Sequence, residues 1–166
     1  MANIYTTPWN FTTADQAVTK ALVSITRNGL RSATVQATAH GFVANQVISI
    51  QGANPSAWNG AYRIESVVDA NNFLVRIEDW RSALANSGAV GNALTVAYWG
   101  NVIWIQQALW DGAVAGGLLL TDVTGDIIWN PSSPAFSGTL TYMKAEPVNG
   151  LVINTLATGT LQISIH

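Results

Sequence analysis

Few side chains in this sequence are suited to catalysis at neutral pH. The chain has two histidines, His40 and His166, and no cysteine, so thiolate chemistry, disulfides and cysteine-based metal sites are excluded. His40 lies at a predicted step from strand to turn, in Thr38-Ala39-His40-Gly41, where its ring can cap the backbone; we expect it to have a structural role. The sequence contains no serine-hydrolase elbow, zinc-protease motif, P-loop or dinucleotide-binding glycine motif.

The nine acidic residues fall mainly at predicted turns, where aspartate accepts hydrogen bonds from the nearby chain. Asp122 and Asp126 flank one such turn, and a calcium site built from their oxygens is an alternative that lacks the spacing of an EF-hand. A paired-carboxylate glycosidase would need Glu65, Glu78 and Glu146 to meet, which their spacing does not require. We therefore predict that the protein is not an enzyme and that it has no catalytic residue, cofactor or metal.

The composition indicates a folded chain with few charges. Of 166 residues, 49% are hydrophobic and 10% are charged, with seven Lys and Arg against nine Asp and Glu. Disordered chains have the opposite composition, and a chain without a basic surplus lacks the charge that nucleic acid binding requires. The most apolar stretch, residues 108–121, is interrupted by Asp111 and three glycines and is too short for a membrane helix. We expect neither nucleic acid nor a membrane as a partner.

Hydrophobic and polar residues alternate along much of the chain, which is typical of half-buried β-strands. Dipeptides that suit tight turns, such as Asn28-Gly29, Gly100-Asn101 and Asn149-Gly150, separate these segments. The sequence therefore predicts an all-β protein. Strands are expected at residues 20–26, 33–38, 46–51, 62–65, 73–78, 93–98, 102–109, 117–122, 126–129, 139–145, 148–154 and 161–165.

Only two short segments have helical signals. One starts at Thr13, with Gln16 completing a capping box, and the other covers residues 79–86. Small and polar residues around the second suit a connector between two β units. We divide the chain into an N-terminal arm with the first strand (1–29), a small β-barrel-like module (30–80), a connector (81–92) and an antiparallel, jelly-roll-like β-sandwich (93–166). In an alternative, the arm adds a strand to the C-terminal sheet, and residues 30–90 are an insertion in one continuous sandwich.

The seven tryptophans divide into two groups. Some, such as Trp104, lie in apolar predicted strands and are assigned to the core. Others lie in the arm, in a loop or at a turn, where a large ring serves as an anchor in a protein contact. Stacking on sugars is the alternative role for these exposed rings. The predicted interface residues are Trp9, Phe11, Trp58 and Trp110.

The N-terminal segment, residues 1–19, is too apolar for a free tail because Ile4, Tyr5, Trp9 and Phe11 stand among Asn and Thr. We expect it to dock on its own C-terminal sheet or on a neighbouring subunit. It has no features of a signal peptide, so we expect synthesis in the cytoplasm. The C-terminal strands carry few charges that would protect their edges, which predicts a homo-oligomer, a trimer being one form.

Residues 33–77 contain an ordered set of strands and turns that includes Ala39-His40-Gly41, Gly52-Ala53, Asn59-Gly60 and Asn71-Asn72-Phe73. This arrangement resembles a short β module that recurs in bacteriophage virion and tail proteins, and it is similar to a small barrel-like domain of ubiquitin-activating enzymes. The C-terminal part, from residue 104 onward, more loosely resembles small phage structural proteins built as β-sandwiches.

The resemblance implies a virion protein made in the host cytoplasm. We expect it to decorate or cement the capsid through contacts with the major capsid protein or other virion proteins. The alternative is a tail, collar or fibre-base component with host-surface or carbohydrate binding. The resemblance carries no catalytic residues.

Overall fold

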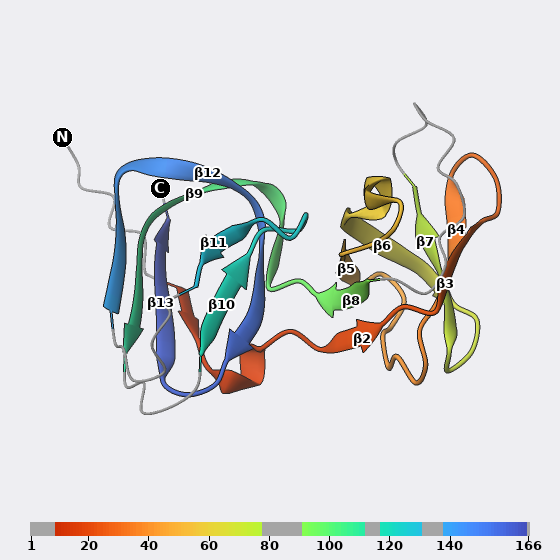
Figure 1. Cartoon of the computed structure of the whole chain (residues 1–166), viewed down its shortest axis with the longest axis horizontal. Coiled ribbons are helices and arrows are strands. Elements are labelled where there is room, and N and C mark those ends of the chain that lie inside the picture. Colours follow the sequence, from red (N-terminus) through yellow and green to blue (C-terminus); the bar gives the residue numbers. More distant parts are fainter. Residues whose placement is uncertain (1–8, 78–90, 112–116, 131–137, 166) are drawn as a thin grey trace. The chain divides into compact units, whose positions relative to one another are not determined.

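The structure is a computed structural model that describes residues 9–77, 91–111, 117–130 and 138–165. This part of the chain contains thirteen β-strands and two short 3-10 turns (Figure 1), which confirms the all-β prediction. The chain divides into two compact units. The first comprises Met1–Ala17, Ala97–Asp122 and Asp126–His166, and the second comprises Val18–Val96 and Val123–Gly125.

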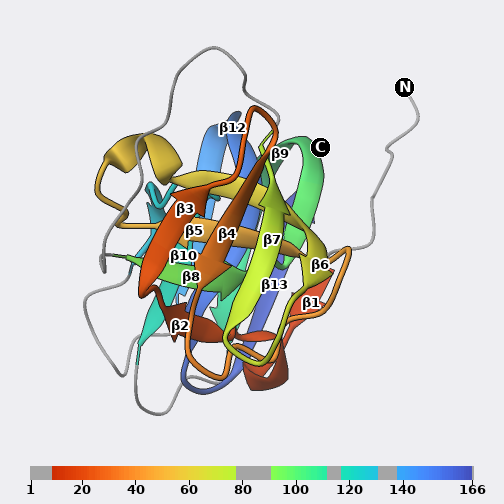
Figure 2. The same ribbon diagram turned by 90° about the vertical axis from the view of Figure 1, so that its right-hand side faces the viewer.

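Seven strands form the sheet of the second unit, in the order β2-β8-β5-β6-β7-β4-β3. Each strand is antiparallel to its neighbours, and Figure 2 looks onto β3, β4 and β7 side by side. The strands are β2 (Thr19–Ala21), β3 (Ser24–Arg27), β4 (Ser32–Gln36), β5 (Val47–Gln51), β6 (Gly60–Val67), β7 (Asn72–Arg76) and β8 (Asn92–Thr95).

The two outermost strands of this sheet, β2 and β3, are consecutive pieces of one chain segment. β2 pairs with β8 and β3 pairs with β4, and only Leu22 and Val23 lie between them. The amide of Leu22 donates to the carbonyl of Gly91 at 2.9 Å, and that of Val23 donates to the carbonyl of Gln36 at 2.8 Å. The sheet therefore closes on itself into the small barrel that the sequence predicts.

This closure gives the second unit wider limits than the predicted module of residues 30–80. The closing segment, residues 19–27, precedes that range. β8 lies after the predicted module, in residues assigned to the connector and the sandwich. It pairs with both β2 and β5. The alternating strands direct one set of side chains inward, as in β4, where Ala33 and Val35 are buried and their neighbours are half-buried.

Six strands form the sheet of the first unit, in the order β1-β13-β9-β12-β10-β11. All neighbouring pairs are antiparallel. The strands are β1 (Trp9–Phe11), β9 (Tyr98–Asp111), β10 (Leu118–Thr121), β11 (Ile127–Trp129), β12 (Gly138–Leu156) and β13 (Thr160–Ile165).

The long strand β12 turns this sheet into two layers. Its first part pairs with β9 and its last part pairs with β10, and Figure 1 shows β9 and β12 bending together over one end of the unit. Buried side chains from β9, β10, β12 and β13 form the core between the layers. The unit is thus an antiparallel sandwich, as predicted.

Two predicted turns lie inside these long strands. Gly150 has a φ of 73°, and the pairing register shifts between Asn149 and Leu151. The Asn149-Gly150 dipeptide therefore forms a bulge that bends β12 instead of a hairpin turn. Gly100-Asn101 likewise lies within β9.

The arm supplies β1, which pairs with β13 through Trp9 opposite Ile163 and Phe11 opposite Leu161. After β1 the chain makes a 3-10 turn, Thr13–Asp15, whose N-cap is Thr12 in a capping box with Asp15. The predicted capping box of Thr13 and Gln16 is thus displaced by one residue. The helical turn predicted at residues 79–86 lies outside the described residues.

The chain leaves the first unit after Ala17 and returns to it at Ala97, and these two points lie close together. The amide of Ala17 donates to the carbonyl of Ile153 at 2.7 Å, and the amide of Ala97 donates to that of Leu151 at 2.9 Å. Both carbonyls belong to the same short stretch of β12. The chain therefore leaves the first unit and returns to it at neighbouring positions, so residues 18–96 form an insertion.

The ends of the inserted segment also meet each other. The amide of Thr95 donates to the carbonyl of Val18 at 3.1 Å, and the amide of Val18 donates to Oγ1 of Thr95 at 2.8 Å. Each unit is therefore closed by its own hydrogen bonds where the chain passes between them.

Candidate functional site

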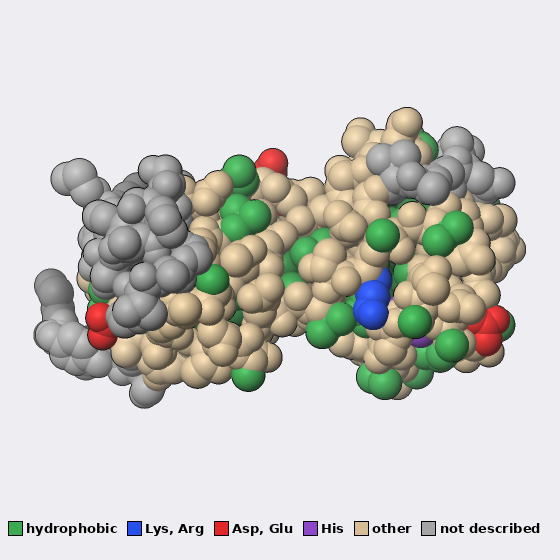
Figure 3. Space-filling view, turned by 60° about the horizontal axis from the view of Figure 1, so that its bottom comes forward, with side chains coloured by type: hydrophobic (Ala, Val, Ile, Leu, Met, Phe, Trp, Pro, Cys, Tyr) green, Lys and Arg blue, Asp and Glu red, His purple; other side chains and the backbone are tan. Residues whose placement is uncertain are grey.

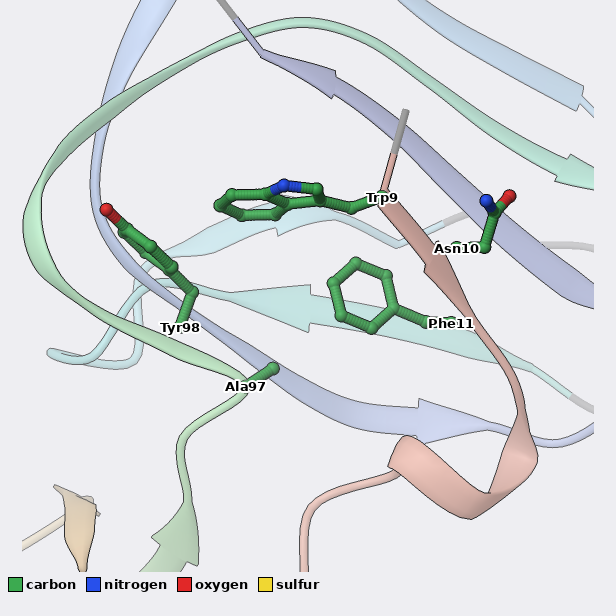
Figure 4. A pocket seen from close by; sticks show the side chains of 5 residues that line it. All are labelled: Trp9, Asn10, Phe11, Ala97 and Tyr98. Atoms are coloured by element: carbon green, nitrogen blue, oxygen red, sulfur yellow. The ribbon is translucent and has the colours of Figure 1, made fainter. Parts of the chain in front are cut away.

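An open hollow of about 280 Å³ lies in the first unit, where the arm meets the start of β9. Among the residues that the structure describes, its lining contains three aromatic side chains and no charged one (Figure 4). The lining residues are Trp9, Asn10, Phe11, Ala97 and Tyr98.

The alternation of β1 directs Trp9 and Phe11 toward the core side of the sheet. Their cross-strand partners, Ile163 and Leu161, are fully buried, and both aromatic rings pack against the core of the unit. Asn10 between them extends to the opposite side of the strand (Figure 4). The two rings therefore continue the core out to the edge strand of the sheet.

Tyr98 completes the hollow from the start of β9. Its position is held by pairing with Leu151, which is buried, and by the bond from the amide of Ala97 to the Leu151 carbonyl. The centroid of the Tyr98 ring lies 4.8 Å from that of Trp9, with the planes at 39°. Phe11 meets Trp9 edge to face at 6.4 Å. The three aromatic side chains are thus held by ring contacts and by core packing.

The polar atoms of the lining do not converge on one point. Figure 4 shows the Tyr98 hydroxyl directed away from Phe11 and the Asn10 amide on the far side of β1. The described lining is mainly aromatic, and Asn10 and Ala97 complete it. Such a surface favours an uncharged apolar group, because a charged group placed there would lose hydration without gaining a partner.

Of the four predicted interface residues, the structure brings together only Trp9 and Phe11. Trp58 and Trp110 are 0% exposed, which corrects their placement as surface anchors. Trp58 closes a 3-10 turn and packs into the core of the second unit beside Tyr62, at 6.2 Å between ring centroids. Trp110 faces the core of the first unit.

Trp110 also makes the hydrogen bond that a buried indole needs. Its Nε1 donates to the carbonyl of Thr158 at 2.7 Å. Trp104, assigned to the core by its apolar strand, is 41% exposed, whereas its neighbours Ile103 and Ile105 are buried. Alternation along β9 thus turns Trp104 outward, where it lies across from Pro147 of β12.

His40 has the structural role expected of it. The ring is 2% exposed, and its Nδ1 accepts a hydrogen bond from the amide of Phe42 at 3.0 Å. Its Nε2 lies 3.0 Å from the carbonyl of Asp69, so Nε2 carries the proton and donates. The ring also contacts Phe42 and Phe73, with centroids at 5.5 and 4.8 Å. Nε2 therefore joins the turn of His40 to the turn at Asp69, whereas Nδ1 holds the chain of its own turn at Phe42.

Asp69 and Asp122 accept hydrogen bonds from backbone amides of their own turns, as the sequence suggests. Oδ1 of Asp69 accepts from the amides of Asn71 and Asn72 at 2.7 and 2.9 Å. The Asn71 amide and the side-chain amide of Asn72 hold the pKa of Asp69 below its ordinary value. Asp122 accepts from the amide of Asp126 through Oδ1 at 3.0 Å.

Sequence reasoning missed Tyr98 as a member of the candidate site. Tyr98 ends a predicted strand like many others, and no local pattern marks it. Its proximity to Trp9 depends on two strand pairings, β1 with β13 and β9 with β12, that join distant parts of the chain.

Comparison of the chain with protein-family models, with curated proteins and with solved structures finds no match. Within the described ranges, no three His, Cys, Asp or Glu side chains gather as a metal site would require. The helical segments of the same ranges lack the length and apolar character needed to cross a bilayer.

Proposed function

We propose that this protein is a structural component of a bacteriophage particle that decorates or cements the capsid through protein contacts and catalyses no reaction. The aromatic hollow carries the proposal. Two predicted contact residues of the arm, Trp9 and Phe11, meet Tyr98 there at an open site whose described lining residues carry no charge. Partly exposed Trp and Tyr side chains in a preformed depression are typical of the centres of protein interfaces.

The phage assignment rests on the resemblance of residues 33–77 to a module of virion and tail proteins. These residues supply nearly all of β4 and the whole of β5, β6 and β7. The turns that carry the resemblance also hold the barrel together. His40 bonds to the turn at Asp69, and the side chain of Asn59 accepts from the amide of Ala53 at 2.8 Å.

Low charge supports a subunit that works inside an assembly. Sixteen of 166 residues are Lys, Arg, Asp or Glu, and only scattered charged side chains appear on the face shown in Figure 3. The cores of permanent interfaces are depleted in charged residues. We propose a homo-oligomer that docks on the major capsid protein or on other virion proteins.

The test is the location of the protein in particles of the phage that encodes it. Quantitative mass spectrometry of purified particles gives the copy number, and electron cryomicroscopy gives the position. We expect copies distributed over the capsid shell. Copies confined to the neck or tail would favour the alternative of a tail, collar or fibre-base component. Absence from purified particles would overturn the virion proposal.

A further inference from the structure

We infer that Asn28 is a site of slow, spontaneous covalent modification, in which its side chain condenses with the amide of Gly29 and is converted to aspartate and isoaspartate. The chain has three Asn-Gly steps, at residues 28–29, 59–60 and 149–150. Glycine has no side chain to shield its nitrogen from the preceding asparagine, so all three have the required sequence. The structure places only the first of them in a position to react.

The reaction needs no reactant other than water. The amide nitrogen of Gly29 loses its proton to solvent and bonds to Cγ of Asn28, while the bond from Cγ to Nδ2 breaks and ammonia leaves with a proton from water. Water then opens the cyclic imide at one of its two carbonyls, which gives aspartate or isoaspartate. Ring closure brings the side chain and the following nitrogen into one plane, so the backbone between the two residues must be able to rotate.

Asn28 and Gly29 lie in the loop that joins β3 to β4 (Figure 2), and both are exposed. β3 ends at Arg27 and β4 begins at Ser32, so neither residue belongs to a strand. A Cβ placed on Gly29 would meet no atom within 4 Å, and its amide donates to none of the residues that the structure describes. Water and the Asn28 side chain can therefore both reach this nitrogen.

One hydrogen bond restrains the Asn28 side chain. Its Nδ2 donates to Oγ1 of Thr34 at 2.6 Å, and this bond is exposed. Such a bond contributes little, because water can replace either partner. The backbone amide of Asn28 donates to the carbonyl of Ser32 at 2.9 Å, but that bond involves neither reacting group. Ring closure therefore breaks one weak bond and no strand pairing.

The step at Asn59 and Gly60 is held in a geometry that does not close. Oδ1 of the half-buried Asn59 accepts from the amide of Ala53 at 2.8 Å. The Asn59 backbone is extended, with a ψ of 134°, which directs the Gly60 nitrogen away from the side chain. Gly60 is also paired with Ile50 of β5. Rotation to the reactive geometry would break both the Ala53 bond and this pairing.

The step at Asn149 and Gly150 is held by its strand. Asn149 pairs with Val102 and Leu151 pairs with Tyr98, so β9 holds β12 on both sides of Gly150. Asn149 is exposed, but Gly150 is buried. Rotation between the two residues would break this pairing, so the folded chain protects Asn149 from the reaction.

The test compares the three steps within one molecule. The full chain is incubated at mildly alkaline pH, folded in buffer and unfolded in guanidinium chloride, while NMR follows the side-chain amide signals of the three asparagines. In the unfolded chain, all three signals should decay at similar rates. In the folded chain, we expect Asn28 to decay within about tenfold of its unfolded rate, while Asn59 and Asn149 persist. Mass spectrometry of peptides identifies the two products at residue 28.

Two variants isolate the geometry of the loop. Thr34→Val removes the acceptor of the Asn28 side chain and keeps a β-branched residue in β4, so it should speed the conversion in the folded chain by about two- to tenfold. Its rate in guanidinium chloride should match that of the wild type. Asn28→Gln is the matched control, because its longer side chain keeps an amide but closes an imide far more slowly. Circular dichroism checks that each variant is folded.

A persistent Asn28 signal in the folded chain, under conditions that convert the unfolded chain, would overturn the inference. Equal decay of all three signals in the folded chain would also overturn it. An unchanged rate in Thr34→Val would overturn the restraint assigned to Thr34.

Conversion adds one negative charge to a chain whose formal net charge is -2. Ion-exchange chromatography of incubated protein should therefore resolve a more acidic form that elutes with the variant Asn28→Asp. A single peak after prolonged incubation would contradict the conversion. None of these outcomes depends on where the protein lies in a particle, so the virion proposal stands or falls separately.

Discussion

Two tryptophans on strand β9 show how strongly the surroundings of a side chain determine its contribution to the stability of the fold. Trp110 is 0% exposed and donates to the Thr158 carbonyl, whereas Trp104 is 41% exposed. We expect Trp110→Ala to lower the free energy of unfolding by about 3–5 kcal/mol and Trp104→Ala by less than about 1 kcal/mol. Urea denaturation followed by circular dichroism measures both. Similar losses for the two variants would contradict the burial of Trp110.

His40 joins its own turn to the turn at Asp69 through Nε2, and it bonds to the Phe42 amide within its own turn through Nδ1. His40→Ala removes two hydrogen bonds and a buried ring, and should lower the free energy of unfolding by about 2–4 kcal/mol. His40→Asn retains an acceptor near the Phe42 amide and should lose less. The two losses can be compared by denaturant titration at pH 7, with the exposed Val43→Ala as a control that changes little. Equal stability of His40→Ala and the wild type would show that the His40 ring does not stabilise the barrel.

The pKa of Asp69 is held below its ordinary value, first by the Asn71 amide and then by the Asn72 side chain. A lowered pKa in the folded state means that the carboxylate stabilises the fold above about pH 4, the range in which it is charged in the unfolded chain as well. That contribution is lost as the pH falls through the lower, folded-state pKa. Asp69→Asn should therefore be less stable than the wild type at neutral pH.

The stability difference between the wild type and Asp69→Asn should shrink below about pH 4. The measurement is the free energy of unfolding of both proteins between neutral and strongly acidic pH. A difference that stayed constant over this range would show that the charge of Asp69 is not what stabilises the turn.

At the scale of elements, Gly91 is required where β8 begins. Its φ is 101°, and a Cβ there would lie 2.7 Å from the carbonyl oxygen of Gln51 and 2.9 Å from the amide of Ala53. We expect Gly91→Ala to lower the free energy of unfolding by about 3–5 kcal/mol, from backbone strain plus the clash. Gly29→Ala is the matched control, since Gly29 has a φ of 145° and a Cβ added there would meet no atom within 4 Å.

Gly29→Ala should lower the free energy of unfolding only through backbone strain, by about 1–2 kcal/mol. Thermal and denaturant unfolding of both variants measure the difference between them, which isolates the clash at Gly91. Equal losses from the two substitutions would mean that β5 yields to the added methyl group.

Local periodicity is sufficient to predict most strands, because alternation marks the buried face of each strand without reference to its partners. Local periodicity is insufficient where pairing between strands far apart in the sequence determines whether a segment is a strand or a turn. Asn149-Gly150 has the composition of a turn, yet β12 continues through it because β9 pairs on both sides of the bulge. Tyr98 belongs to the hollow only because β1 adds to β13.

Burial of the tryptophans is likewise beyond local reasoning. Trp58 lies in a loop by sequence, but the loop folds its ring into the barrel core. Trp104 lies in an apolar run, but alternation on β9 places it outside. Composition identifies which rings are large, whereas the completed sheet determines which of them are covered.

At the scale of the whole molecule, each unit has its own hydrophobic core, and every described residue of each core belongs to that unit. Residues 17 and 97 bond to neighbouring carbonyls of β12, and Val18 bonds to Thr95. We therefore expect residues 18–96 to fold alone. We also expect the chain to fold when this segment is replaced by a short Gly-Ser linker, with Val123→Ser because Val123 is buried in the second unit.

Dispersed amide signals in NMR spectra of both products, matching subsets of the full-length spectrum, would be the expected result. A fragment of residues 97–166 is the control. It lacks β1, so it leaves the buried partners Leu161 and Ile163 without their cover and should aggregate. Collapse of the linker variant, under conditions in which the full chain is folded, would contradict the independence of the first unit.

The pairing of β1 with β13 also sets an order of events during protein synthesis. The barrel of residues 18–96 can close while the ribosome is still translating, but Trp9 and Phe11 have no strand to join until residues 161–163 emerge. At about 5–20 residues per second, that delay is roughly 8–30 seconds. Throughout it the aromatic side chains of the nascent arm have no partner strand to cover them, which makes this segment a natural target for ribosome-associated chaperones.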